Sequence, residues 1–168
     1  MNDPVNKSIR CMLMPLSSIN LVIPNSAVAE IIGYSTPMSV PDTSDWFLGV
    51  VMWRGVFIPV VSVEEMCAID SVHIGSRSRI GIIYNPEKDP DLPYLGIHIQ
   101  DIPRAYLAEI DEMEAGTDDG LGEYLLSRMD DDDRARVIPD LDRIIEKLKT
   151  EYDREKIDQI KGQDLLAL

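Results

Sequence analysis

The segment FLGVVMWRGVFIPVVSV, residues 47–63, limits the possible folds of this chain more than any other stretch. It is apolar almost throughout, and Arg54-Gly55 interrupts it near the middle. Because glycine readily adopts the positive φ that a tight hairpin turn needs, the pair predicts a turn between strands at 47–52 and 56–61. Both faces of each strand are apolar, which is typical of strands buried between two layers.

The length of the chain, 168 residues, predicts about one domain. No run reaches the roughly 20 apolar residues that span a bilayer, and the start MNDPVNKS lacks the layout of a signal peptide. Cys11 and Cys67 lie in apolar stretches without metal-ligand spacing, so we expect two reduced, buried thiols. These features predict a cytoplasmic protein with no direct membrane insertion.

The charge is strongly negative and unevenly distributed. Thirty acidic and sixteen basic residues give −14, and residues 101–168 alone carry twenty acidic and ten basic residues, which is −10. Such a surface repels phosphate backbones and anionic lipid headgroups. We therefore expect no nucleic-acid partner.

The pattern of apolar runs and turn residues predicts a mostly β chain. We expect three further hairpins, with strands at 9–16 and 19–24, 79–84 and 94–99, and 123–129 and 134–139. We also expect one or two helical turns after a cap at Asn25 or Ser26, a loop at 33–45, a short helix at 63–69, an irregular acidic segment at 101–120 and a helix at 140–161. Small barrels or a sandwich fit this order best.

The sequence shows no recognisable catalytic or metal-binding motif. His73 and His98 have no His or Cys at the spacing of a zinc site, and no nucleophile elbow or phosphate-binding loop is present. The acidic run Asp130–Asp133 lacks the central Gly and final Glu of a calcium loop, and it predicts a solvated hairpin tip. We expect no enzyme activity, no cofactor and no metal.

Two charged residues in apolar surroundings need an explanation. Glu30 lies within AVAEII and requires a polar partner. Arg54 could lie on the surface of its turn, extend along apolar neighbours to water, or form a bidentate pair with a carboxylate such as Glu30.

The order AVAEIIGY, a proline-containing loop and LGVVMWRGVFIPVVSV resembles the CheW-like domain, an adaptor module of bacterial chemosensory signalling. The positions that fit the family signature are Gly49, Val50, Arg54, Gly55, Pro59, Val60 and Val63. LGIHIQDI, EYL and RVIPDLDRII resemble later parts of the domain. The chain departs from the signature at Met52-Trp53, where the family prefers Asn-Leu, and at Ser62, where it prefers Asp.

The resemblance implies two intertwined, SH3-like, five-stranded barrels followed by a C-terminal helix. It covers residues 9–148, with an N-terminal tail at 1–8 and a C-terminal helical extension at 149–168. Members of the family have no catalytic site. By resemblance, Glu30 and Arg54 form an ion pair near the surface that faces the partners.

The partners implied are the regulatory domain of a chemotaxis-type histidine kinase and the cytoplasmic tip of a chemoreceptor, which would recruit the protein to membrane-associated receptor arrays. The residues we expect at the partner surface are Glu30, Gly49, Val51, Trp53, Arg54 and Gly55. We hypothesise a stand-alone, divergent adaptor, in a system that steers pilus-driven twitching motility. The alternative is an acidic interaction module with the same fold and a different client, which Trp53 and the acidic second half motivate.

Overall fold

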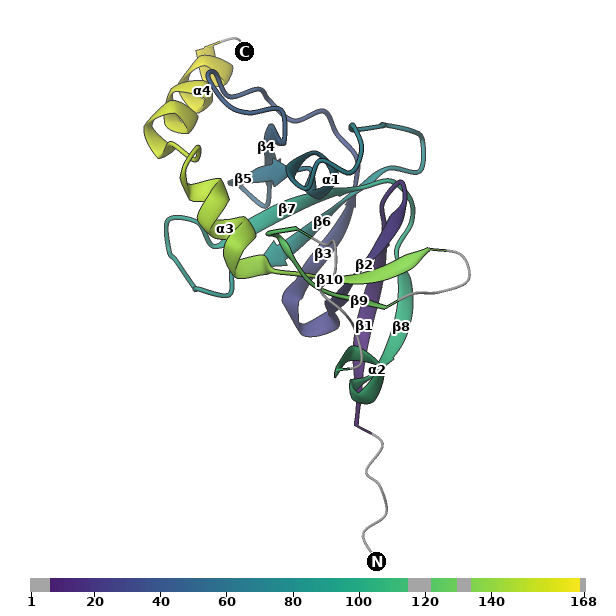
Figure 1. Ribbon diagram of the computed structural model, residues 1–168. Helices are drawn as coiled ribbons and strands as arrows, with labels where there is room; N and C mark the ends of the chain where they lie inside the picture. Colours follow the sequence, from purple (N-terminus) through teal and green to yellow (C-terminus); the bar gives the residue numbers. More distant parts are fainter. Residues whose placement is uncertain (1–6, 115–121, 130–133, 167–168) are drawn as a thin grey trace, which may run out of the picture.

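The computed structural model describes residues 7–114, 122–129 and 134–166. Its strands form two five-stranded sheets, which confirms the predicted mostly β fold (Figure 1). Sheet A has the order β8 (Arg104–Glu109), β1 (Ser8–Pro15), β2 (Ile19–Pro24), β10 (Ala135–Pro139) and β9 (Leu125–Met129). Sheet B has the order β3 (Val28–Gly33), β6 (Arg79–Tyr84), β7 (Tyr94–Ile99), β5 (Val56–Val61) and β4 (Phe47–Trp53).

The two sheets are intertwined along the chain. All five strands of sheet B lie in sequence between β2 and β8, so sheet B is inserted into sheet A. Each sheet contains one parallel pair, β2 with β10 and β5 with β7, and its other neighbours are antiparallel. The four predicted hairpins are all present, although the Asp130–Asp133 tip lies outside the described residues.

The hairpin of β4 and β5 is apolar on both faces because each face packs in a different core. Val50 belongs to the large core between the sheets, whereas Val51 and Ile58 belong to a separate cluster inside sheet B. That inner cluster takes side chains from all five strands, including the edge strands β3 and β4. Sheet B is therefore curled around its own apolar interior, as a small barrel is.

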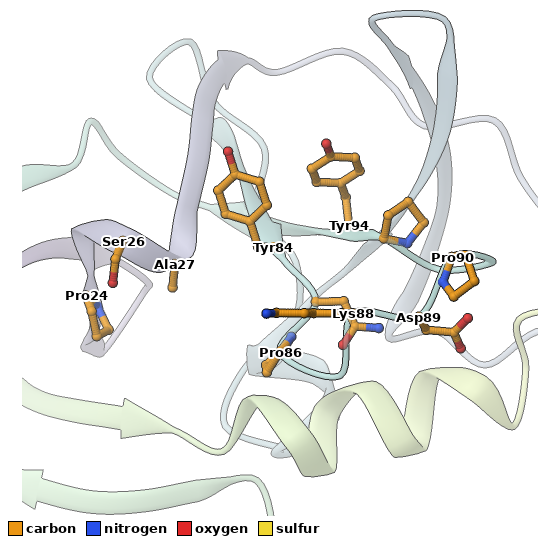
Figure 2. Close-up of a pocket in the computed structure, with 11 residues that line it drawn as sticks. Pro24, Ser26, Ala27, Tyr84, Pro86, Lys88, Asp89, Pro90 and Tyr94 are labelled. Carbon is orange, nitrogen blue, oxygen red and sulfur yellow. The ribbon is translucent and has the colours of Figure 1, made fainter.

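Hydrogen bonds of one buried side chain organise the loop between β6 and β7. Asn85 is buried; its side-chain amide donates to the Leu92 carbonyl over 2.8 Å, and its Oδ1 accepts the Glu87 N–H over 2.9 Å. Figure 2 shows the loop carrying Pro86 and Pro90 beside Tyr84 and Tyr94, the first cross-strand pair of the hairpin. The prolines of the loop therefore lie next to the tyrosines at the ends of β6 and β7.

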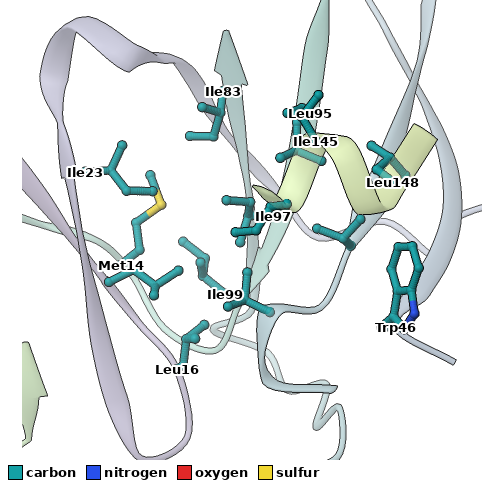
Figure 3. Close-up of a cluster of buried hydrophobic side chains, with 14 of the residues drawn as sticks. Met14, Leu16, Ile23, Trp46, Ile83, Leu95, Ile97, Ile99, Ile145 and Leu148 are labelled. Carbon is teal, nitrogen blue, oxygen red and sulfur yellow. The ribbon is translucent and has the colours of Figure 1, made fainter. Parts of the chain in front are cut away.

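The principal core lies between the sheets and beneath helix α3 (Leu141–Lys149). Figure 3 shows Ile145 and Leu148 of α3 against Leu95 and Trp46. Ile145 and Leu148 are fully buried, as is Ile144, so α3 turns one apolar face toward this core. Asp140 begins α3 by accepting the Arg143 N–H over 3.1 Å, as a capping residue does.

Three expectations about local structure are wrong. The helical turns after Asn25 reduce to one 3-10 turn, Asn25–Ala27, because the β-branched residues that follow pair with β6 as strand β3. The segment at 101–120 contains β8, which pairs with β1 along six residues, and the short helix α2 (Ile110–Glu114). The helix at 140–161 is two helices, α3 and α4 (Arg154–Leu166), separated at 150–153.

Helix α1 (Val63–Met66) explains why the departure at Ser62 leaves the fold intact. The Ser62 hydroxyl accepts the Glu65 N–H over 3.2 Å and so caps the helix, a task that Asp performs equally well. Within the described part of the chain, no helix is both long and apolar enough to cross a membrane.

Candidate functional site

The turn between β4 and β5 presents Arg54 to solvent. Arg54 and Gly55 both have positive φ, +48° and +79°, which is the backbone of a type I′ hairpin turn. The prediction of a positive φ at Gly55 is confirmed, and Arg54 shares it. The turn holds Arg54 in a left-handed conformation, which is uncommon for arginine. This backbone conformation fixes the direction in which the side chain leaves the turn.

Glu30 joins Arg54 and Trp53 into one cluster. Trp53 Nε1 donates to Glu30 Oε2 over 2.8 Å, and Arg54 Nη2 donates to the same oxygen over 3.1 Å. The Arg54 guanidinium also lies 4.7 Å from the Trp53 ring centroid, within the range of a cation–π interaction. The ion pair implied for Glu30 and Arg54 is therefore confirmed, with Trp53 as a third member.

The cluster bridges the two edges of sheet B. Glu30 lies on β3 and Trp53 on β4, which are the first and last strands of that sheet. Their hydrogen bond closes one end of the curled sheet, yet Arg54 keeps 70% and Glu30 keeps 40% of the side chain exposed. The three residues thus serve the fold and remain available to another molecule.

An aromatic row extends the cluster toward the β6–β7 loop. Trp53 contacts Tyr94 edge to face, with ring centroids 5.0 Å apart, and Tyr94 lies 5.6 Å from Tyr84. Tyr84 is 48% exposed and is the outer end of this row. Neither tyrosine stands out in the sequence as a site residue, although the two occupy matching ends of the predicted strands at 79–84 and 94–99.

A surface groove of about 590 Å³ adjoins the row. Tyr84 and Tyr94 line it together with Pro24, Ala27, Pro86 and Pro90 (Figure 2). On the hairpin of β4 and β5, Met52 and Val56 add exposed apolar area, with 52% and 41% of each residue accessible. Exposed aromatic and apolar side chains beside a charged pair are typical of surfaces that bind another protein. We call Glu30, Trp53, Arg54, Tyr84 and Tyr94, with this groove, the docking cluster.

Two of the expected partner-surface residues lie in the interior. Val51 is 4% exposed, inside sheet B. Gly49 is buried with φ +123°, and a Cβ there would lie 2.1 Å from the Met38 carbonyl oxygen. The structure therefore brings Glu30, Trp53, Arg54 and Gly55 to one surface, whereas Gly49 and Val51 shape the hairpin from beneath.

The histidines are poorly placed for catalysis. His98 is buried inside sheet B, 5.5 Å from the Tyr34 ring centroid, and neither of its ring nitrogens has a hydrogen-bond partner in the described structure. Burial lowers the pKa of His98 below its usual 6.5. His73 is exposed and lies 3.6 Å from Asp70. Among the described residues, no group of three or more His, Cys, Asp or Glu could hold a metal ion.

Comparison with known proteins decides the family. The family model of the CheW-like domain matches residues 10–149. The chain belongs to the CheW-like domain family. A solved structure, the scaffolding protein TtCheW from Thermoanaerobacter tengcongensis, has the same fold, with a TM-score of 0.68 and 15% sequence identity over 83% of this chain and 88% of that one. No curated protein sequence matches the chain.

Proposed function

We propose that this CheW-like protein is a non-enzymatic adaptor that couples chemoreceptors to a chemotaxis-type histidine kinase in the cytoplasm. The observation that carries the proposal is the docking cluster, in which Arg54 on its turn and Tyr84 at the end of β6 are exposed and Trp53, at the end of β4, is partly buried between them and Glu30. Binding energy at protein interfaces concentrates in a few residues, enriched in Trp, Tyr and Arg. Membership of the CheW-like family and the fold shared with a scaffolding protein support the same function.

The partners we propose are the kinase regulatory domain and the cytoplasmic tip of a receptor. Met52 and Val56 would supply apolar contacts around the turn, while Arg54 and Glu30 would supply oriented charge. The groove between Tyr84 and the prolines would receive an apolar side chain of a partner. Through these partners the protein would join receptor arrays at the membrane.

Binding of the purified protein to each chemotaxis-type kinase regulatory domain of its own cell, and to a receptor tip, tests the proposal. We expect Arg54→Ala to weaken partner binding at least tenfold, the loss of about 1.4 kcal/mol. An exposed ion pair contributes roughly 0–1 kcal/mol to stability, so the thermal midpoint should fall by no more than about 4 °C. Trp53→Phe removes the indole donor and retains an aromatic ring, which separates the hydrogen bond to Glu30 from ring packing.

Arg143→Ala is the matched control because Arg143 is also an exposed arginine in weak ion pairs, with Asp140 and Glu123. This variant should bind as the wild type does. If Arg54→Ala binds normally, the docking cluster is not the partner surface. If the thermal midpoint of Arg54→Ala falls by much more than about 4 °C, Arg54 stabilises the fold, and weaker binding by this variant no longer supports a role in docking.

The kinase that binds also identifies the pathway. The departure at Met52-Trp53 motivates our proposal of an accessory pathway that steers twitching motility, and binding only to a flagellar kinase would contradict it. Binding to no kinase or receptor, by a folded protein, would favour the second candidate, an acidic interaction module with another client. The charge of −10 over residues 101–168 is the observation that favours that candidate.

A further inference from the structure

A second cavity lies away from the docking cluster and has a different chemistry. It is open to solvent, with a volume of about 330 Å³, and lies where the ends of β1 and β2, the segment before β6, the chain between β7 and β8, and the start of β10 meet. Arg77, Arg104 and Arg134 line it, together with Asn20, Asp101 and Pro15. Three guanidinium groups and one carboxylate give this cavity a local charge of +2, in a chain whose net charge is −14.

Two of the three arginines are held in place by hydrogen bonds that leave other donors free. Arg77 Nε donates to Asp101 Oδ1 over 2.6 Å, and Arg134 Nη1 donates to the Leu16 carbonyl over 2.6 Å. Asp101 is itself fixed by the Ile102 N–H, again over 2.6 Å. Each guanidinium has five N–H donors, so at least four remain on Arg77 and on Arg134 for a ligand.

Arg104 supplies the third guanidinium without any competing contact. It is the first residue of β8, opposite Leu13 on β1, and is exposed. Among the described residues, its side chain has no hydrogen-bond or ion-pair partner. An anion in the cavity could therefore accept from Arg104 without breaking an existing interaction.

We propose that this cavity binds a compact phosphate-class anion, of the size of pyrophosphate. Planar guanidinium groups match the oxygens of phosphate with two parallel hydrogen bonds each, and a local charge of +2 matches a multiply charged anion. The volume lies at the lower end of small-molecule sites, which span roughly 300–1,000 Å³. Asn20, which is buried and also lines the cavity, adds a side-chain amide that can donate to a further oxygen.

The overall charge of the chain favours a small anion over an acidic protein segment. Charges more than about 8 Å apart are largely screened at physiological ionic strength, so a compact ligand experiences mainly the groups that line the cavity, three arginines and Asp101. An acidic macromolecule would bring further negative charge against a chain whose net charge is −14. That repulsion selects for a ligand that fits within the cavity.

Calorimetric titration of the full chain with pyrophosphate at low salt tests the proposal. We expect one site, an affinity that falls as salt is added, and a loss of tenfold or more in Arg104→Ala, as for a hydrogen bond to a charged group. Arg104→Lys keeps the charge and loses the planar fork, so its affinity should fall between those of the other two proteins. A thermal midpoint equal to that of the wild type would verify that Arg104→Ala is folded.

Arg154→Ala is the matched control, since Arg154 pairs with Asp91 in the loop at the opposite end of β7 from Asp101. This variant removes the same charge and should change the affinity less than twofold. The proposal is overturned if the wild type does not bind pyrophosphate, or if Arg104→Ala and Arg154→Ala weaken binding equally. A tetraglutamate peptide that binds more tightly than pyrophosphate, with the same dependence on Arg104, would also overturn it and assign the cavity to an acidic protein.

Discussion

Replacing Gly49 by alanine should destabilise the protein far more than replacing any exposed glycine. A Cβ at this position would lie 2.1 Å from the Met38 carbonyl oxygen and 2.7 Å from its carbonyl carbon, so the backbone of the 33–45 loop must move. That carbonyl accepts the Val50 N–H over 2.9 Å, and the Met38 N–H donates to the Val50 carbonyl over 2.8 Å. The substitution would therefore disrupt the β-bridge between Met38 and Val50, the only one that pairs this loop with β4 in the described structure.

The size of the effect follows from these contacts. Two backbone hydrogen bonds contribute about 1 kcal/mol each, and holding alanine at φ +123° costs about 1–3 kcal/mol. We expect the free energy of unfolding to fall by about 3–5 kcal/mol, a large part of the roughly 5–15 kcal/mol typical of a domain. In urea, with a slope of about 2 kcal/mol per molar, the midpoint should drop by about 1.5–2.5 M.

Two other glycines provide the controls for urea unfolding. Gly55 has a positive φ but no atom within 4 Å of a Cβ, so Gly55→Ala should cost only about 1–2 kcal/mol of backbone strain. Gly33 has neither constraint, and Gly33→Ala should stay within about 0.5 kcal/mol of the wild type. If Gly49→Ala and Gly33→Ala have the same urea midpoint, the contact with Met38 does not fix the loop and the reasoning is refuted.

Two further predictions concern titratable groups that are buried, His98 and Cys11, or partly buried, Cys67, which was expected to be buried as well. Burial lowers the pKa of His98 below 6.5, so as the pH falls this histidine is protonated in the unfolded chain before it is protonated in the folded one. The contribution of His98 to the free energy of unfolding is therefore complete above pH 6.5 and is lost as the pH falls through the pKa of the folded state. Urea unfolding between pH 5 and 7.5 should show this loss in the wild type but not in His98→Leu, and parallel profiles would contradict it. Burial raises the pKa of the Cys67 thiol to about 11 and also raises that of Cys11. At pH 8 both thiols should react with iodoacetamide at least tenfold more slowly in the folded protein than in urea, and equal rates would contradict burial.

The sequence predicted strands well wherever both faces of a strand are buried. Strands β6 and β7 match the predicted ranges 79–84 and 94–99, because short, mostly apolar runs on either side of a proline-rich turn leave little choice of structure. β8 was missed because only Ala108 on it is buried, so its composition is that of a loop. Its structure comes from pairing with β1, which lies about one hundred residues earlier in the chain and has no local signal.

The candidate site was predicted in part for a similar reason. Glu30 and Arg54 stood out because a charge in an apolar run needs a partner, and the structure pairs them. Tyr84 and Tyr94 gave no such signal, since tyrosine is common in strands. Only the register of the β6–β7 hairpin makes them neighbours and places them beside Trp53.

The insertion of sheet B into sheet A has a consequence for the order in which the protein is made. Residues 28–99 contain every strand of sheet B, so this part can close while the ribosome is still adding the rest of the chain. Strands β1 and β2 emerge first but wait for β8, β9 and β10, and β2 meets its parallel neighbour β10 only after more than one hundred further residues. Pairing across so long a loop is slow. The first hairpin to be synthesised is therefore among the last parts to be completed, and until then its exposed edges are the part of the nascent chain most open to chaperones.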